Sequence, residues 1–308
     1  TVGIGHTRWA THGEPSDVNA HPHLSESGRF AVVHNGIIEN YNQLKEYLIS
    51  KGITFRSKTD TEVIAQLIEY YYKGNLIDTI IKVLSKLNGS YAIGVISQEN
   101  PDEIIAVRKE SPLIVGLGEH ENYIASDVPA ILAKTRKIYR LENNEIAILT
   151  RENVRIINTD KEEVKKEIQT VNWDVSAAEK GGYEHFMFKE IMEQPKAIHD
   201  TIKPRIKNNR VVLDEISITD EQLKNFNKIE IIACGSAYHV GVVAKYVFEK
   251  ILRKPVEVDL ASEFRYREPI VDDKTLAVVI SQSGETADTR EAMKEAQRRG
   301  AHVISIVN

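Results

Sequence analysis

Short apolar runs that alternate with polar residues fill the first half of the chain, and such alternation is typical of strands with one buried face. Residues 40–50, 61–73 and 76–87 interrupt these runs with apolar side chains at helical spacing. The middle helix opens on TDTE, a capping-box pattern that joins Thr59 to Glu62. Many short strands with few helices predict an α+β domain with largely antiparallel sheets. The strands are expected at residues 29–38, 90–97, 103–109, 122–127, 145–150 and 154–158.

The last quarter of the chain has a different pattern, in which wholly apolar strands are separated by helices. Helices are expected at residues 238–252 and 285–300. An earlier helix, at residues 185–202, is expected to be broken or kinked around Pro195. Apolar strands that alternate with helices predict an α/β domain with a parallel sheet covered on both faces. These strands are expected at residues 229–234, 256–260, 276–281 and 302–307.

Periodicity is lost at residues 172–182, which end in a pair of glycines, so the domain boundary is expected there. We therefore predict a first domain at residues 1–174, a linker at 175–184 and a second domain at 185–308. The chain opens on Thr1 and closes just after an apolar run, without the polar residues typical of termini. It is therefore expected to be a fragment, with the second domain truncated.

Composition narrows the class of protein. A chain of 308 residues with 42% apolar content can bury a core in each of two domains. The net charge of -5 and the lack of a long basic block argue against binding to nucleic acid. No apolar run is long enough to span a membrane, and no signal-peptide pattern opens the chain. The single cysteine, Cys234, excludes an internal disulfide and fits a reducing compartment, so we expect a cytoplasmic enzyme or small-molecule binder.

Two strands of the second half run into polar turns, CGSAYHVG and SQSGETADT. Ligands of parallel sheets bind where strands end and helices begin. In the second turn three hydroxyls surround Gly284 at a predicted helix start, where free amides and the helix dipole favour an anion. A sugar phosphate suits such hydroxyl-rich turns. The side chains expected to bind it are Ser236, Ser281, Gln282, Ser283 and Thr286.

Simpler interpretations of these turns remain open. Ser281 or Ser283 could serve only as a helix cap. Neither turn holds an arginine or lysine, and the glycine patterns of nucleotide-binding loops are missing, so a nucleoside triphosphate is not indicated. Cys234 is a candidate nucleophile with His239 five residues later, but its place at the end of an apolar strand favours a buried structural residue.

The two turns, with ASEFRYR between them, resemble the first sugar-isomerase-type (SIS) domain of the glutamine–fructose-6-phosphate aminotransferase family, the glucosamine-6-phosphate synthases. In the first half, GHTRWATHG, HNGIIENY and KTDTEV resemble the glutamine-binding segments of that family's glutaminase domain, which is a type 2 glutamine amidotransferase domain. The resemblance therefore covers essentially the whole chain in family order. It implies an αββα sandwich of the N-terminal-nucleophile (Ntn) hydrolase type, followed by an incomplete SIS domain.

The resemblance also implies a reaction. Family members hydrolyse L-glutamine and channel the ammonia to fructose 6-phosphate, giving glucosamine 6-phosphate and glutamate for amino-sugar biosynthesis. It implies no metal or redox cofactor, and a homodimer in the full-length protein. Two alternatives stay open: another Ntn amidotransferase, such as the phosphoribosylpyrophosphate type, or a sugar-phosphate-binding regulator with a degenerate glutaminase domain.

Roles in the glutamine site follow from the resemblance and from the chemistry of each group. Arg8 can hold the α-carboxylate of glutamine by a bidentate pair, and Asp60 can hold its α-ammonium group. The resemblance assigns the oxyanion hole to the Asn35 side chain and the Gly36 amide, donors that typically supply about 3 kcal/mol each. It further assigns Thr11 and His12 to the pocket lining, Trp9 to the ammonia channel and His21 to support of the pocket.

Each of these residues also has a plain structural interpretation. Arg8 could form a surface ion pair, and Asp60 could be a charge at a helix N-terminus. Asn35-Gly36 is a frequent hairpin turn. Trp9 could be ordinary core, and His21 a buried histidine.

The sequence departs from the family pattern at two places. The family nucleophile is a cysteine at the mature N-terminus, and no cysteine lies in the first 233 residues here. Ala237 stands where many members have a hydroxyl, which removes one donor from the sugar site. The lysine, glutamate and histidine of isomerisation would follow Asn308. The chain is therefore expected to recognise glutamine without cleaving it.

Overall fold

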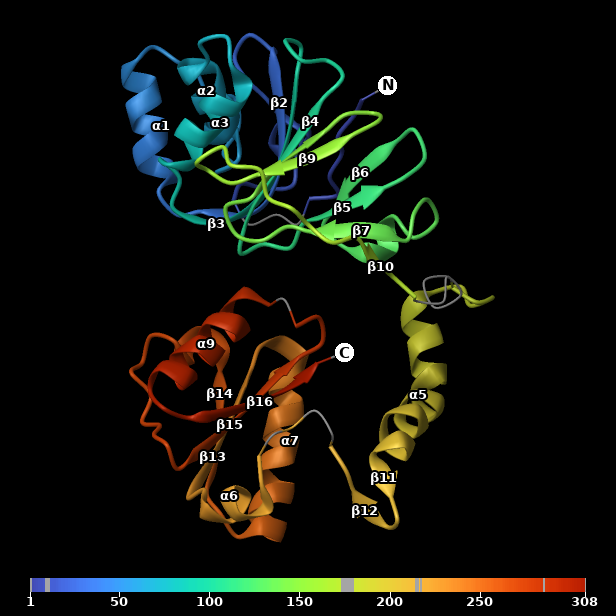
Figure 1. The fold of residues 1–308 in the computed structure, drawn as a ribbon. Coiled ribbons are helices and arrows are strands. Elements are labelled where there is room, and N and C mark those ends of the chain that lie inside the picture. The colour runs from blue at the N-terminus through green and yellow to red at the C-terminus, as the bar shows by residue number, and fades with distance from the viewer. Residues whose placement is uncertain are drawn as a thin grey trace. The chain divides into compact units, whose positions relative to one another are not determined.

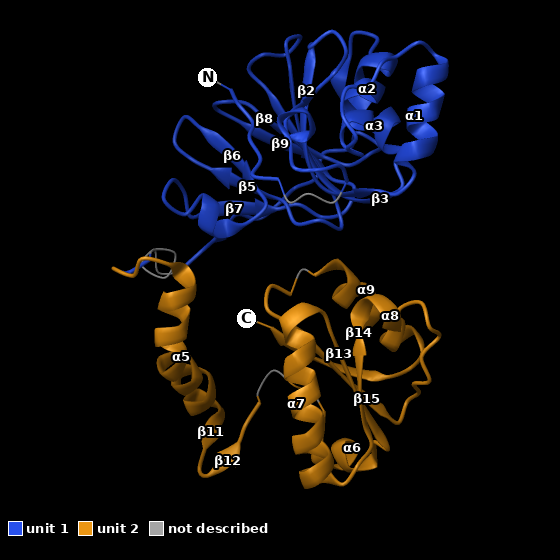
Figure 2. Cartoon of the chain, turned by 180° about the vertical axis from the view of Figure 1, so that it is seen from behind, with its two compact units in different colours: residues 1–181 blue, residues 182–308 orange. Residues whose placement is uncertain are grey.

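The computed structural model describes residues 2–8, 12–172, 180–213, 216, 218–284 and 286–307. The chain divides into two compact units, residues 1–181 and residues 182–308 (Figure 2). Among the described residues, no helix has the length and apolar character needed to cross a membrane.

Unit 1 is built on two antiparallel sheets (Figure 1). The larger sheet has the order β1-β2-β3-β4-β8-β9, and the smaller has the order β10-β7-β5-β6. The antiparallel sheets are those that the alternating pattern predicts. The strands of the larger sheet are β1 His23–Leu24, β2 Phe30–Ile38, β3 Gly89–Ser97, β4 Ile104–Lys109, β8 Ile146–Leu149 and β9 Val154–Ile157. Those of the smaller are β5 Ile114–Leu117, β6 Asn122–Ala125, β7 Lys137–Arg140 and β10 Gln169–Thr170.

Alternate residues of β2 and β3 face opposite sides of the larger sheet. Phe30 and Ile93 point to a core shared with the helices, because they belong to the cluster that also holds Leu67. Ala92 points the other way, toward the smaller sheet, and packs in the cluster with Val115. The helices on the first face are α1 Tyr41–Ser50, α2 Glu62–Tyr71 and α3 Leu76–Leu84, close to their predicted positions (Figure 1).

The outer face of the smaller sheet carries little helix. In the described part of unit 1 it is covered by the 3-10 helix η2 Val128–Ala130 and by the apolar residues Ile131 and Leu132 that follow. A helical layer and two sheets are therefore present, but the second helical layer of the expected αββα sandwich is not formed by these residues. The short 3-10 helix η1 Asp17–Asn19 precedes β1.

Unit 2 contains a parallel sheet of order β14-β13-β15-β16, as its apolar strands predict. Ile231 and Ile232 are neighbours in β13 but belong to different cores, one on each face of the sheet. Helix α7 packs on one face of the sheet and approaches it closely at Gly241, where a Cβ would lie 2.9 Å from the Ile231 side chain. The strands are β13 Lys228–Ala233, β14 Val256–Leu260, β15 Thr275–Ser281 and β16 His302–Val307, with helices α7 Gly235–Leu252, α8 Ala261–Phe264 and α9 Ala287–Arg298.

Two helices of unit 2 differ from the prediction. Helix α7 begins at Gly235, three residues early, because Gly235 adopts a φ of 57° and lets β13 turn directly into the helix. Helix α5, Phe186–Ile202, runs through Pro195 without a break. The remaining elements are η3 Lys203–Arg205, β11 Ile206–Lys207, β12 Arg210–Val211 and α6 Asp220–Asn225.

The capping box lies elsewhere than predicted. Thr219 and Gln222 form one at the start of α6, with both reciprocal hydrogen bonds present. At α2 the N-cap is Thr61, which makes no side-chain cap bond, and the Glu62 carboxylate binds other amides. Half of the box that TDTE predicts is present, because the Thr59 hydroxyl accepts a hydrogen bond from the Glu62 amide at 3.4 Å. The reciprocal half is missing, because the Glu62 carboxylate binds the amides of Arg56 and Ser57.

Candidate functional site

Three segments that are distant in sequence meet in unit 1, and we call them the N-terminal loop cluster: residues 6–8 with 12–14, residues 34–38 of β2, and residues 57–62 before and at the start of α2. They bring together Arg8, His12 and Asp60, which the sequence analysis assigns to glutamine binding, and Asn35, which it assigns to the oxyanion hole. Trp9 and Thr11, assigned to the channel and the lining, lie outside the described residues.

Asn35 and Gly36 lie inside a strand and not in a hairpin turn. Asn35 pairs with Ala92, and Gly36 with Tyr91, as β2 continues to Ile38. Gly36 has a φ of 123°, and a Cβ there would overlap the carbonyl oxygen of Ser90. The hairpin interpretation is therefore wrong: this glycine permits a close approach of two strands.

Arg8 organises the loop around it. Its guanidinium donates hydrogen bonds to the carbonyl oxygens of His12 at 2.9 Å, Gly13 at 3.1 Å and Glu14 at 3.1 Å. These contacts replace the surface ion pair that was the alternative for this residue. A guanidinium has five N–H groups, so two remain for a ligand carboxylate. Arg8 itself has a φ of 54°, which is rare for a residue other than glycine.

Asp60 is buried, with 3% of its surface exposed. Its Oδ2 accepts a hydrogen bond from the Ile38 amide at 2.8 Å, and its Oδ1 lies 3.9 Å from Nδ1 of His12. The carboxylate thus binds strand β2 instead of the free amides of α2, against the helix-terminus interpretation. The Asp60 carboxylate therefore lies beside Ile38, which is three residues along β2 from Asn35.

Glu62 and Asn19 hold the loops in place. Glu62 was expected only as part of a capping box, and Asn19 was not predicted. The Glu62 carboxylate accepts hydrogen bonds from the amides of Arg56 at 2.8 Å and Ser57 at 2.6 Å. Burial alone would raise the pKa of Glu62, but the hydrogen bonds from Ser57 and Arg56 lower it below its ordinary value. Asn19 donates to the Glu14 carbonyl and accepts from the Lys58 amide, so it joins two of the segments.

Histidines surround Asn35. His6 Nε2 lies 2.6 Å from Asn35 Oδ1, and the His6 ring stacks on His21 with centroids 4.4 Å apart. Burial, with smaller contributions from neighbouring histidines and Arg8, lowers the pKa of His21 to about 3. His34 Nδ1 lies 2.9 Å from the Thr61 hydroxyl, and burial lowers the pKa of His34 to about 4. His21 is a half-buried ring that packs against His6, and its support of a glutamine pocket stays a prediction.

The second predicted site lies at the carboxyl ends of β13 and β15, and we call it the strand-end site: residues 234–236, 281–284 and 286. Strand β14 pairs with one side of β13 and β15 pairs with the other side. The strand order therefore reverses between β13 and β15. Ligands of open parallel sheets bind at such a point. The topology therefore supports the loops chosen from sequence.

Ser281 shapes the second loop. It is 6% exposed, its hydroxyl accepts a hydrogen bond from the Gly284 amide at 3.1 Å, and it lies 3.2 Å from the Thr286 hydroxyl. The N-cap of α9 is Thr286, without a side-chain cap bond, so the N-cap position is occupied by neither Ser281 nor Ser283. The predicted ligand groups that lie exposed at the strand ends are Ser236, Gln282, Ser283 and Thr286.

A cation near this site was missed in the sequence. Arg265 follows α8, and its guanidinium lies 3.3 Å from Asp288 in the first turn of α9. Spacing along the chain could not reveal it, because the two residues meet only through packing of α8 on α9. Cys234 is half-buried against the core that contains Ile232, which agrees with a structural role.

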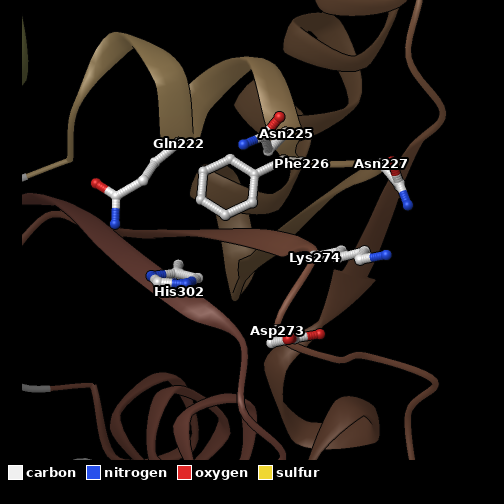
Figure 3. Close-up of a pocket in the computed structure, with 7 residues that line it drawn as sticks. All are labelled: Gln222, Asn225, Phe226, Asn227, Asp273, Lys274 and His302. Atoms are coloured by element: carbon white, nitrogen blue, oxygen red, sulfur yellow. The ribbon is translucent and has the colours of Figure 1, made fainter.

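A pocket of about 450 Å³ lies at the opposite end of the unit 2 sheet (Figure 3). Its walls come from the end of α6 and from the starts of strands, and the rings of Phe226 and His302 face one another there, 5.2 Å apart. Ligands of parallel sheets bind at carboxyl ends, so this hollow at the amino ends is not assigned to the chemistry. Its lining residues are Gln222, Asn225, Phe226, Asn227, Asp273, Lys274 and His302.

Comparison with known proteins identifies the class. The chain belongs to the glutamine amidotransferase domain family, whose model matches residues 1–181, and the SIS domain model matches residues 222–308. It is 61% identical over its full length to glutamine–fructose-6-phosphate aminotransferase (isomerizing) of Caldanaerobacter subterraneus subsp. tengcongensis, covering 51% of that protein. The same enzyme of Clostridium acetobutylicum is 59% identical, again over 100% of this chain and 51% of the relative.

The chain therefore spans about half the length of the curated relatives it matches. Among solved structures, the C-terminal domain of glucosamine-fructose-6-phosphate aminotransferase from Francisella tularensis aligns with 41% identity and a TM-score of 0.40. That alignment covers 42% of this chain and 37% of the other.

Proposed function

We propose that this chain carries the glutamine site and part of the sugar-phosphate site of a glutamine–fructose-6-phosphate aminotransferase. The observation that carries the proposal is the meeting of Arg8, Asn35 and Asp60, which come from three separate segments and supply complementary groups for one amino acid. The identity to curated relatives over the whole chain supports the same reaction. The overall reaction converts L-glutamine and fructose 6-phosphate to L-glutamate and glucosamine 6-phosphate.

Each group has a distinct task in amide hydrolysis. The guanidinium of Arg8 binds the α-carboxylate, and the buried carboxylate of Asp60 binds the α-ammonium group. A thiolate attacks the side-chain amide carbon, and its carbonyl oxygen becomes an oxyanion. The Asn35 amide and the Gly36 N–H donate hydrogen bonds to that oxyanion. The amide nitrogen takes up the proton that the thiol released and leaves as ammonia, and water then hydrolyses the thioester, which releases glutamate and restores the thiol.

The attacking thiol is not among these 308 residues, because their one cysteine is Cys234 in unit 2. By itself the chain is therefore expected to bind glutamine and not hydrolyse it. At the strand-end site the hydroxyls of Ser236, Ser283 and Thr286 would donate to the phosphate of the sugar, with the α9 amides. Ala237 provides no hydroxyl there, so the backbone would replace that donor.

The finer properties of the complete protein are part of the proposal. They are an Ntn-type thiol mechanism, ammonia passage near Trp9, pocket lining by Thr11 and His12, a homodimer, action in the cytoplasm, and no metal or redox cofactor. A single cysteine supports the reducing compartment. Light scattering of the complete protein tests the dimer.

The decisive experiment measures glucosamine 6-phosphate formed by the protein expressed from its complete coding sequence, with and without glutamine. We expect glucosamine 6-phosphate to form only when glutamine is present. The Arg8→Ala variant should raise the KM for glutamine about 100-fold, since a bidentate charged contact is lost. Arg151→Ala, whose side chain is 76% exposed, is the matched control and should leave KM unchanged. No product from the unaltered protein would refute the proposed function.

A further inference from the structure

The His6 side chain is held at both ring nitrogens. Its Nδ1 accepts a hydrogen bond from the Arg8 amide at 2.9 Å, and its Nε2 lies 2.6 Å from Asn35 Oδ1. A ring nitrogen that accepts from an N–H group carries no hydrogen of its own. The neutral ring therefore has its hydrogen on Nε2, and this group donates to the Asn35 oxygen.

The Asn35 amide is oriented by this contact. Its oxygen faces the imidazole of His6, so Nδ2 and both of its N–H groups lie on the side of the amide away from His6. Among the described residues, none accepts a hydrogen bond from Asn35 Nδ2. Rotating the amide by half a turn would bring its NH₂ group against the Nε2–H of His6, so two donors would face one another at 2.6 Å. One orientation of the amide is therefore selected.

The backbone conformation that makes this possible is uncommon. Arg8 has a φ of 54°, a region that residues other than glycine rarely adopt, and in this conformation its amide reaches back to His6. Local strain of this kind persists where the surrounding structure enforces it, often at functional sites. Three carbonyl contacts of the Arg8 guanidinium enforce it here.

The His6 ring is also held on its face. It stacks on His21, whose ring lies 5.0 Å from that of His23, and His23 Nε2 lies 3.0 Å from the Thr59 hydroxyl. Thr59 in turn is bonded to Ser57 at the start of the third segment of the cluster. The imidazole is thus fixed in position as well as in tautomer.

We propose that His6 is a positioning residue that selects, through its Nε2–H, the orientation of the Asn35 amide in which Nδ2 faces the oxyanion. The inference rests on the proposed glutamine hydrolysis. His6 does not touch the substrate: it acts through Asn35, while Arg8 and Asp60 hold the amino-acid head group. Loss of His6 should therefore reduce the rate of hydrolysis and leave glutamine binding almost unchanged.

The test uses the complete protein and three substitutions of His6. His6→Phe keeps a ring to stack on His21 but has no donor, and should lower kcat for glutamine hydrolysis about 10- to 100-fold, with KM within about 3-fold, by analogy with loss of an oxyanion donor. His6→Ala should behave alike. His6→Gln has both an amide donor and a carbonyl acceptor, and should recover most of kcat. His120→Phe, at an exposed histidine, is the matched control and should leave both constants unchanged.

The outcomes separate the two proposals. An unchanged kcat in His6→Phe, or a raised KM with kcat intact, would overturn the positioning role and leave the proposed function standing. An unaltered protein that does not hydrolyse glutamine would overturn both. If His6→Phe does not fold, nitrogen NMR of the unaltered chain decides: a hydrogen on Nε2 of His6 supports the inference, and a hydrogen on Nδ1 refutes it.

Discussion

Side chains hold the N-terminal loop cluster together, whereas the backbone presents the strand-end site. In the cluster, Asp60, Asn19 and Glu62 are buried and bind amides or carbonyls of other segments. At the strand-end site most predicted ligand groups are exposed, and topology alone brings the loops together. The two sites should therefore fail differently: substitutions in the cluster should cost stability, and those at the strand ends should cost affinity.

The largest effect is expected for Gly36→Ala. A methyl group there would overlap the Ser90 carbonyl and force a φ of 123° on an L-residue, so the free energy of unfolding should fall by about 4 kcal/mol. Urea denaturation of the chain measures it. Gly28→Ala is the control, because its φ of 78° is also left-handed but nothing lies within 4 Å. That variant should lose only about 1 kcal/mol, and an equal loss in both would show that strand proximity does not matter.

Asn19→Ala should be next. Asn19 is 3% exposed, and its removal leaves the Lys58 amide without this acceptor and the Glu14 carbonyl with Arg8 as its remaining donor, at a cost of about 3 kcal/mol in the free energy of unfolding. Hydrogen exchange should also accelerate in the two loops that it joins. The exposed Asn153→Ala is the control and should change neither quantity. Unaltered exchange in the loops would mean that the side chain does not couple them.

Acid should weaken unit 1 through His34. Burial lowers its pKa from 6.5 to about 4, so below pH 6.5 the unfolded chain binds a proton that the folded chain does not. The free energy of unfolding therefore falls as the pH falls, by about 2 kcal/mol between pH 6.5 and about pH 5. His34→Asn should reduce this slope and leave the part due to His21, whose pKa is also lowered, to about 3. His185→Asn, with a side chain 73% exposed, should not change the slope. A slope that is equal in all three proteins would exclude His34 as its source.

Ser281→Ala should have the smallest effect and should act on the ligand. It removes the acceptor of the Gly284 amide and the neighbour of Thr286, so the affinity for fructose 6-phosphate should fall about 5- to 10-fold, or about 1 kcal/mol. Calorimetric titration of the complete protein measures it. Ser85→Ala, a hydroxyl at the end of α3, is the control. A large loss of stability instead of affinity would erase the contrast between the two sites.

The same contrast explains what the sequence could reveal. Parallel and antiparallel sheets follow from periodicity, and the strand-end loops follow from strands that stop at Ala233 and Ser281. The short strands β5 and β7 were missed, although β6, β8 and β9, which are equally short, were predicted. The roles of Asn19 and Glu62 in joining the loops were missed because a side chain that binds the backbone of another segment produces no periodic pattern.

The family resemblance identified more residues of the N-terminal loop cluster than the chemistry of the single residues did. The residues alone favoured a hairpin at Asn35-Gly36 and a helix charge at Asp60, and both interpretations were wrong because strand β2 continues through the motif. The apolar pattern predicted a strand at residues 29–38, through both residues, so at this motif it was a better guide than the Asn-Gly turn signal. His6 was missed because its partner Asn35 lies 29 residues away.

The bond between Asp60 and Ile38 has a consequence for substrate length. Asp60 is anchored to the same strand that carries Asn35, so the ends of the glutamine site share one rigid element. The spacing between head-group recognition and the reacting amide is therefore set by the strand. We expect asparagine, which is one methylene shorter than glutamine, and homoglutamine, which is one methylene longer, to reach only one end of the site at a time, a discrimination of about 1–3 kcal/mol in kcat/KM. Strand β2 thus sets the length of the amino acid that can reach both ends of the site.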